Sequence, residues 1–392
     1  MQAELLEFAG YPGPVRASLD ASLRPSVASL LKGWSISPAS DSSAVPQLEI
    51  LADEAHRLTV RGPWVGPDYS LADPVDAACA FIAEILKVQA NESSDSLCVH
   101  AAGVVLGGRA VLFPAGFRAG KSILTAVLAS RGERIIADDA TLISPDAGVA
   151  VGPGISPRLR LPVPDTLRAV TRAFIDTRME LAGRRYGYLT LPDGRLLANG
   201  ERVPIGEFVQ IERQAEGGAT LAELPKEQAL KALIWQNFAR RIPAGRILAA
   251  LSGLVRTRPT LVLRYADVET AADLLQGHFA DWPAETGSFA ILDPWQEDVI
   301  AVADGRRWRR GPSLVEKQFE GGHFIADEEN GRIFHLNATA AVIWHLLSAG
   351  DETSDVAALL LDAFPETDAL RIADDVGVLA QSFREKGLLV PA

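Results

Sequence analysis

The order of apolar and polar residues predicts a small α+β region at the N-terminus. Residues 48–52 and 57–61 alternate as strands on either side of a turn. Residues 71–88 repeat apolar side chains at helical spacing. The pattern ends in a polar stretch near residue 95, and nothing in residues 1–95 suggests chemistry.

From residue 97 the pattern predicts an α/β domain in which strands and helices alternate. The predicted strands are 98–106, 109–113, 134–137, 141–143, 206–212 and 260–265, and the predicted helices are 123–130, 225–238 and 244–254. Residues 153–202 are rich in Pro, Gly and Arg and are expected to form long connections. This domain is assigned residues 96–283.

The tail, residues 312–392, shows the pattern of a winged helix. Three short strands are predicted at 314–318, 323–327 and 332–336, with an Asn330-Gly331 turn between the last two. Asn337 is expected to cap a helix over 338–348, and helices over 353–363 and 367–387 follow.

Residues 284–311 are predicted to be a linker between these two domains. The run Arg306–Arg310 places four arginines around Trp308. We interpret this run as a solvated linker whose tryptophan covers a neighbouring surface. The alternative is that the arginines and the tryptophan bind an acidic peptide or a phosphate.

Charge argues against nucleic acid as a partner. The 392 residues contain 38 Lys and Arg against 50 Asp and Glu, a net charge of −12. The tail alone has five basic and 14 acidic residues, 5 − 14 = −9, whereas phosphate backbones require clustered positive charge. A peptide partner fits the tail better.

Two cysteines, Cys79 and Cys98, could pair with each other, but they suggest neither a secreted disulfide framework nor a zinc-binding spacing. The chain lacks an apolar run of about 18 residues and a basic-then-apolar N-terminal signal. We therefore expect a soluble cytoplasmic protein with no membrane span.

The strongest motif lies between the strand 109–113 and the helix 123–130. A strand, a glycine loop, Lys-Ser and a helix form the layout of a phosphate-binding loop, whose backbone N–H groups and helix dipole attract phosphate. An ordinary strand-to-helix turn with a chance Gly-Lys-Ser is the alternative. The loop residues are Ala115, Gly116, Phe117, Arg118, Ala119, Gly120, Lys121 and Ser122. Lys121 is expected to contact the terminal phosphates of ATP, and Ser122 to bind Mg²⁺.

A carboxylate pair, Asp138-Asp139, follows 17 residues after Lys121 at the end of an apolar strand. In phosphate-loop enzymes an acidic residue on a neighbouring strand helps to anchor Mg²⁺. One carboxylate could face the metal while the other accepts a proton from an attacking hydroxyl, or the pair could be an ordinary polar loop. His100 lies on the preceding strand, where a lone histidine is more often structural than catalytic.

Together, His100-Ala101-Ala102-Gly103, Gly120-Lys121-Ser122 and Ala137-Asp138-Asp139 resemble the catalytic domain of HPr kinase/phosphorylase over roughly residues 97–280. The resemblance implies an α/β fold related to phosphoenolpyruvate carboxykinases, serine phosphorylation and a possible homo-oligomer. It further implies that Asp138 is the base, that Ser122 and Asp139 bind Mg²⁺, that Lys121 contacts the phosphates and that His100 assists.

Departures from that family pattern lie in and after the loop. Ala115 and Arg118 replace loop glycines, and residues 157–161 stand where the family has a glutamate-containing strand. The signature of the reverse phosphorolysis reaction is not visible. The N-terminal 95 residues do not look like those of HPr kinases, so HPr is not expected to be the substrate.

The tail resembles PqqD, the peptide-binding domain also called the RiPP recognition element. The residues that carry this are 331–340, Ile343-Trp344 and Lys386-Gly387-Leu388-Leu389. The resemblance implies that the leader of a ribosomal precursor peptide joins the sheet edge as a strand. The groove is expected between the strand 332–336 and the last helix.

The combined hypothesis is an ATP- and Mg²⁺-dependent kinase that phosphorylates a hydroxyl of a peptide recruited by its own tail. A nucleotide-binding peptide chaperone or scaffold without turnover is the alternative. A kinase for a small molecule, such as free serine or a sugar, would leave the tail unexplained.

Overall fold

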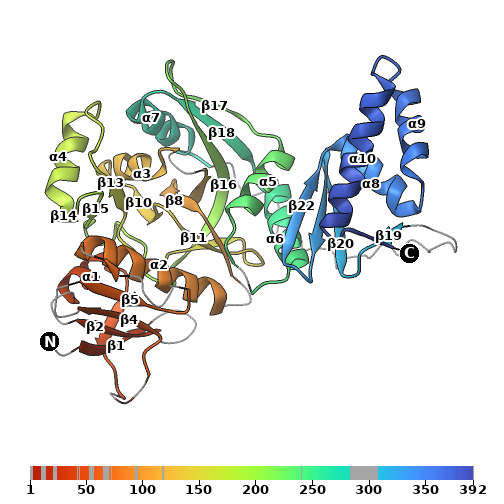
Figure 1. Cartoon of the computed structure of the whole chain (residues 1–392). Helices are drawn as coiled ribbons and strands as arrows, with labels where there is room; N and C mark the ends of the chain where they lie inside the picture. Colours follow the sequence, from red (N-terminus) through yellow and green to blue (C-terminus); the bar gives the residue numbers. More distant parts are fainter. Residues whose placement is uncertain are drawn as a thin grey trace. The chain divides into compact units, whose positions relative to one another are not determined.

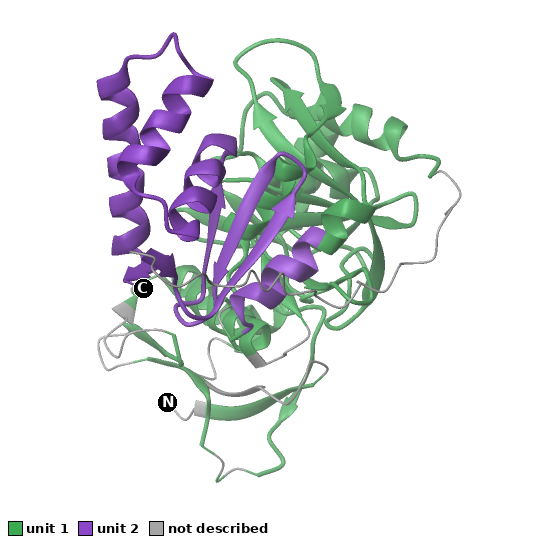
Figure 2. Ribbon diagram, turned by 90° about the vertical axis from the view of Figure 1, so that its right-hand side faces the viewer, with its two compact units in different colours: residues 1–241, 253–289 green, residues 242–252, 290–392 purple. Residues whose placement is uncertain are grey.

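The computed structural model (Figure 1) describes residues 3–9, 15–20, 24–41, 43, 45–52, 57–64, 70–71, 73–92, 96–116, 119–239, 241–282 and 308–391. The chain divides into two compact units (Figure 2). Unit 1 comprises residues 1–241 and 253–289, and unit 2 comprises residues 242–252 and 290–392.

Unit 1 begins with a sheet in the order β3-β1-β2-β4-β5-β6. Its strands are β1 (Ala3–Ala9), β2 (Val15–Asp20), β3 (Ser35–Pro38), β4 (Leu48–Ala52), β5 (Leu58–Arg61) and β6 (Ser70–Leu71). The helices of this region are α1 (Arg24–Leu30) and α2 (Pro74–Glu92), and α2 packs on β4 and β5. The predicted strands at 48–52 and 57–61 are confirmed to within one residue. The helix begins at Pro74, because proline is favoured in a first helical turn, rather than at residue 71.

The larger sheet of unit 1 has the order β10-β8-β9-β16-β12-β11-β7, with β18 beside β16 and β17 beside β18. Its strands are β7 (Leu97–Val99), β8 (Ala101–Leu106), β9 (Arg109–Pro114), β10 (Arg134–Ala137), β11 (Thr141–Ser144), β12 (Val149–Val151), β16 (Arg202–Arg213), β17 (Thr220–Glu223) and β18 (Thr260–Tyr265). β16 runs parallel to both β9 and β18.

The prediction of one strand over 98–106 is wrong, because the backbone breaks at His100. β7 pairs with β11, whereas β8 pairs with β9 and β10. His100 therefore lies between two consecutive strands that pair with different neighbours in the sheet. The sequence pattern does not show this break, because the residues on both sides of His100 are buried and form one nearly continuous apolar run.

The helices of this part are α3 (Lys121–Ser130), α4 (Ala169–Arg178), α5 (Lys226–Gln236) and α7 (Val268–His278). α6 (Ala244–Thr257) belongs partly to each unit, since residues 242–252 are assigned to unit 2. α3 packs against α4, α7 and β8. Phe113, Val127, Leu263 and Leu275 belong to the buried core beneath these helices. The strand before the glycine loop and the helix after it are thus both anchored in one core.

Residues 153–202, where the sequence predicts long connections, also contain α4 and a small sheet in the order β13-β15-β14. Its strands are β13 (Arg158–Arg160), β14 (Met179–Ala182) and β15 (Tyr186–Leu189). The sequence pattern does not predict these strands, because they are short and lie among prolines and glycines.

Hydrogen bonds join the N-terminal region to this segment. Trp34 Nε1 donates to the Pro153 carbonyl at 2.7 Å. The Ser156 N–H donates to the Leu30 carbonyl at 2.8 Å. Tyr188 belongs to the buried core of the N-terminal region. Residues 1–95 therefore pack with the α/β part in one compact unit, and the boundary at 95/96 stays a prediction.

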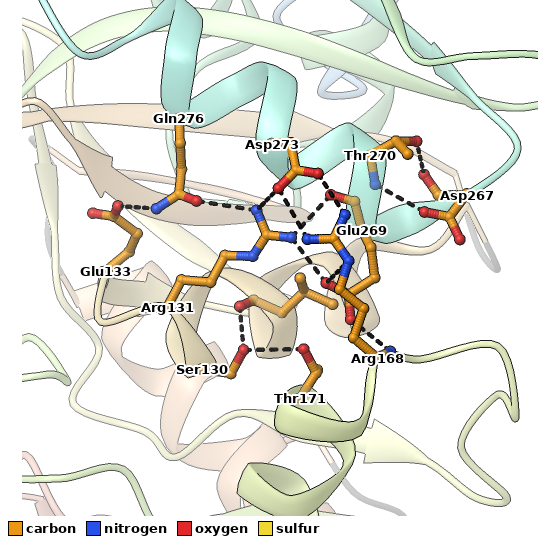
Figure 3. A network of polar contacts seen from close by, with 11 residues as sticks. Ser130, Arg131, Glu133, Arg168, Thr171, Asp267, Glu269, Thr270, Asp273 and Gln276 are labelled. Carbon is orange, nitrogen blue, oxygen red and sulfur yellow. Dashed lines mark hydrogen bonds and ion pairs between the residues drawn. The ribbon is translucent and has the colours of Figure 1, made fainter.

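An ion-pair network holds the C-terminal end of α3 (Figure 3). Arg131 Nη2 donates to Glu269 Oε2 at 2.8 Å, and Arg131 Nη1 donates to Asp273 Oδ1 at 2.7 Å. Arg168, just before α4, donates to Asp273 Oδ2 at 2.6 Å. Glu269 is buried, so the network fixes α3 between α4 and α7 at the end away from the glycine loop.

Unit 2 contains a sheet in the order β20-β21-β22 and a strand pair, β19-β23. Its strands are β19 (Trp308–Arg310), β20 (Leu314–Phe319), β21 (Gly322–Asp327), β22 (Arg332–Leu336) and β23 (Leu389–Pro391). Its helices are α8 (Ala338–Ala349), α9 (Thr353–Ala363) and α10 (Ala369–Glu385). Asn337 Oδ1 accepts from the Ala340 N–H at 2.8 Å, which confirms the predicted cap.

The predicted linker is wrong at Trp308–Arg310, because these residues form β19. Arg310 pairs with Glu316 at 2.7 Å, so it is not available as a grip for an acidic peptide. Trp308 packs against the core of unit 2 beneath Arg384, as expected for a tryptophan that covers a neighbouring surface. Arg306 and Arg307 lie outside the described residues.

Within the ranges given above, every helix is too short or too polar to span a bilayer.

Glu207 on β16 is a buried carboxyl, 8% exposed, whose Oε2 accepts no hydrogen bond from the described residues. Burial raises its pKa from 4.5 to about 7. The folded state therefore binds a proton more tightly than the unfolded state, and this group's contribution to stability is lost as pH rises from about 4.5 through about 7.

We predict that Glu207→Gln raises the melting temperature at about pH 8 and that this difference vanishes near pH 4.5. The pKa shift corresponds to an upper bound of about 3 kcal/mol. Glu223→Gln, at an exposed position on β17, is the control. Calorimetric scans that show the same difference at both pH values would contradict the assignment.

Candidate functional site

The glycine loop joins the end of β9 to the start of α3. Gly120 is the N-cap of α3 and has a left-handed backbone, with φ of 101°. A Cβ at this position would lie 2.4 Å from the Tyr265 hydroxyl. Both the conformation and the close approach require glycine. Phe117 and Arg118 lie outside the described residues.

Ala115 and Lys121 meet inside the loop. Ala115 is buried and is not among the residues with positive φ, so its backbone does not need a glycine. Lys121 Nζ donates to the Ala115 carbonyl at 2.7 Å and to the Gly116 carbonyl at 3.3 Å. Burial lowers the pKa of Lys121, against the opposing charges of Asp139 and Asp138. A phosphate in the loop has to replace these carbonyl contacts.

Asp138 is directed toward the start of α3. It is 6% exposed, and Ser122 Oγ donates to its Oδ2 at 3.0 Å. Burial and the charge of Asp139 raise its pKa to about 6, against the lowering effects of Arg158 and Ser122. Its carboxylate is therefore paired with the hydroxyl that the sequence assigns to Mg²⁺.

Asp139 has different neighbours. Its Oδ1 lies 2.7 Å from His100 Nε2, and Arg158 Nη2 donates to its Oδ2 at 3.1 Å. Burial works to raise its pKa, but the hydrogen bond and charge of His100 and the charge of Arg158 outweigh burial and lower it. Its side chain is 43% exposed, so Asp139 is the more accessible carboxylate.

Arg158 is a site residue that the sequence reasoning missed. It lies on β13, and its guanidinium stacks over the Tyr186 ring at 4.8 Å. Burial opposes its charge, but Asp138, Tyr188 and Asp139 raise its pKa. The alternation of Arg and Leu over residues 158–161 was the available signal, since it is the period of a half-buried strand.

The structure brings the predicted residues His100, Lys121, Ser122, Asp138 and Asp139 into one region. Ser122 contacts Asp138, whereas Asp139 contacts His100 and Arg158. That Ser122 and Asp139 bind Mg²⁺ stays a prediction.

The oxygen donors of Ser122 and Asp138 suit Mg²⁺, which is held by one or two carboxylates together with phosphates and water. No group of three or more His, Cys, Asp or Glu arranged for a metal occurs in the described part of the chain. The donor set therefore fits a metal that arrives with a nucleotide rather than a cage made only of protein ligands.

Unit 2 has its own groove of about 550 Å³, lined by the end of β22, by α8 and by α10. His335 and Leu336 lie on the strand side, and Val376 and Leu379 on the helix side. β22 is an edge strand of its sheet. The groove lies where the sequence placed it, between the strand 332–336 and the last helix.

Residues 322–389 match the family model of coenzyme PQQ synthesis protein D, PqqD. The C-terminal domain is thus similar to PqqD. The match covers less than half of the chain, so it describes this domain and not the whole protein. None of the curated proteins compared matches the chain.

Three solved structures share partial similarity. A lasso peptide synthetase B1 complexed with the leader peptide is 29% identical over 22% of this chain and 99% of its own, with a TM-score of 0.20. TbiB1 in complex with the TbiA(beta) leader peptide is 18% identical over 21% and 93%, with a TM-score of 0.20. The Hpr(Ser) kinase/phosphatase from Coxiella burnetii is 10% identical over 46% and 95%, with a TM-score of 0.23.

We predict that Gly120→Ala destabilises unit 1 by roughly 1–3 kcal/mol, because alanine is strained at this φ, and the Tyr265 hydroxyl blocks its methyl group. Gly116→Ala is the matched control in the same loop, since a Cβ there meets no atom within 4 Å. Thermal unfolding of the two variants measures the difference. Equal melting temperatures would contradict the loop geometry.

Proposed function

We propose that unit 1 is an ATP- and Mg²⁺-dependent kinase for a hydroxyl on a peptide. One observation carries this proposal: two adjacent carboxylates have different partners, Asp138 beside Ser122 at the end of the glycine loop and Asp139 beside His100. A phosphoryl-transfer site needs one oxygen ligand on the nucleotide side and one proton acceptor on the other side.

The contacts support an exchange of the roles that the sequence suggested. Asp138 and Ser122 would hold Mg²⁺, which when bound would supply positive charge for the phosphates of ATP. Asp139 accepts the proton, because it is the more exposed carboxylate and two side chains orient it, His100 and Arg158.

The reaction balances without a further reagent. The acceptor oxygen forms a bond to the γ-phosphorus of ATP while the bond between that phosphorus and the β,γ-bridging oxygen breaks, and ADP leaves. The hydroxyl proton passes to Asp139. Lys121 leaves the carbonyls of Ala115 and Gly116 and neutralises the transferred group, while the N-terminus of α3 faces the phosphates.

Unit 2 supplies the peptide. Its PqqD-like domain has an edge strand, β22, beside a largely apolar groove. An extended peptide adds to such an edge through main-chain hydrogen bonds and places side chains in the groove. Binding there raises the effective concentration of the acceptor at the kinase site.

A nucleotide-binding scaffold without turnover is the second candidate. The observation that favours it is the position of Lys121, whose ammonium is held by loop carbonyls rather than directed into an open loop. Phosphoryl transfer separates the two candidates, because a scaffold incorporates no phosphate.

The test measures phosphate incorporation from γ-labelled ATP into serine-containing peptides at varied Mg²⁺ concentration. We predict that Asp139→Asn lowers the maximal rate by roughly 10²–10⁴-fold without changing the Mg²⁺ concentration for half-maximal rate. Asp138→Asn raises that Mg²⁺ concentration, because it removes a ligand charge.

Lys121→Ala is the inactive control, and melting temperatures confirm that each variant folds. Equal incorporation by wild type, Lys121→Ala and both aspartate variants would rule out the kinase. The opposite split, with the Mg²⁺ requirement changed by Asp139→Asn alone, would restore the roles suggested by the sequence.

We predict that Val378→Asp in the groove weakens peptide binding by at least about tenfold, since it buries a charge against apolar side chains. The matched control is Leu370→Asp, at a similarly exposed position on α10 that does not line the groove. The probe is a displayed library of random peptides selected on the full chain. Clones that bind both variants equally would place the peptide elsewhere.

A further inference from the structure

Two cavities meet at the carboxylate pair of unit 1. One, of about 130 Å³, is lined by Asp138, Arg158 and Tyr188. The other, of about 440 Å³, is lined by His100, Trp64 and Phe238. Both include Asp139, so the proposed proton acceptor faces the two spaces at once.

The N-terminal region builds one wall of both cavities. Ala83 and Leu86 of α2 line each of them. Residues 1–95 contain no motif for chemistry, yet their longest helix lies against the reacting groups. The wall is tied to the α/β part where Gln89 Nε2 donates to Asn199 Oδ1 at 3.0 Å.

A buried carboxylate organises this wall. Glu84 is 1% exposed, and its Oε2 accepts from the Trp64 N–H at 2.9 Å. Its Oε1 pairs with Lys87 Nζ at 3.1 Å. Glu84 thereby holds Trp64 and Lys87, both of which line the larger cavity.

The opposite wall is fixed beside His100. The Phe238 N–H donates to the Cys98 carbonyl at 2.9 Å, and the His100 N–H donates to the Gln236 carbonyl at 2.8 Å. Phe238 packs on a small core that includes Ala140. Trp64 and Phe238 therefore belong to separate, anchored segments that border one space.

The side chains that line the larger cavity indicate which kind of group it can bind. Lys87, which lines this cavity, is already paired with Glu84, so a bound anion would gain little attraction from its charge. Trp64, Leu86 and Phe238 offer apolar surface, and the volume of about 440 Å³ is in the range of small-ligand pockets. A bulky apolar or aromatic side chain fits this surface better than a sugar or a free amino acid.

We propose that this cavity is the acceptor-specificity pocket of the kinase and holds an aromatic or large aliphatic residue one or two positions from the phosphorylated serine. The inference rests on the proposed function. Consecutive Cα atoms are 3.8 Å apart, so a serine at Asp139 places such a neighbour within reach of the cavity. The N-terminal region is thereby part of the acceptor site.

The test uses a positional library of peptides with a central serine and one flanking position fixed at a time. Wild type is expected to prefer aromatic or large aliphatic residues at one of these positions. Ala83→Trp, at an exposed position bordering both cavities, is expected to reduce that preference at least about tenfold. Trp64→Ala is a second variant that opens the cavity and is expected to reduce the preference for aromatic residues.

Ala173→Trp is the matched control, an exposed alanine on a helix of the same unit that lines neither cavity. It is expected to keep the wild-type preference. A flat preference in wild type, or the same preference in Ala83→Trp and Trp64→Ala, overturns the pocket and leaves the kinase standing. No phosphorylation of any peptide by wild type contradicts the kinase itself.

Discussion

Two adjacent negative charges in a small, largely buried space are the constraint on which this site depends. The charge of Asp139 adds to burial in raising the pKa of Asp138, so the pair is costly without compensation. Arg158 supplies a compensating positive charge beside Asp139. Ser122 forms a hydrogen bond with Asp138, and His100 forms one with Asp139. The two carboxylates are thus kept close together but in separate surroundings, and the proposed function gives each of them a different task.

The groups that compensate these charges come from separate parts of unit 1. Arg158 comes from β13, in a segment held by hydrogen bonds to the N-terminal region. The glycine loop comes from β9 and α3, and α3 is held at its far end by Arg131 and Glu269. The site forms only when these separate parts pack together, which gives the N-terminal region a structural reason to belong to the same unit.

Much of the site was visible in the sequence, because loops and strand ends carry their chemistry in short motifs. Gly120, Lys121 and the Asp138-Asp139 pair were found this way. Arg158 and Trp64 were not, since each reaches the site through tertiary packing and belongs to no motif. The break at His100 was not visible because the residues around it are apolar. The position of Ala83 beside the two cavities was not visible because an alanine on a helix suggests only packing.

The tail was the easier part to predict, since its turn, cap and alternating strands are local signals that agree with one another.

The central claim concerns unit 1: we propose that the glycine loop and the two carboxylates together form one nucleotide-binding site. Calorimetric titration of the full chain with ATP, with and without Mg²⁺, tests this most directly. The account predicts binding that weakens at least about tenfold when Mg²⁺ is removed, because Ser122 and Asp138 would hold the ion in the proposed site and its positive charge would favour the phosphates. Binding that is equal with and without Mg²⁺, or no binding at all, would contradict it.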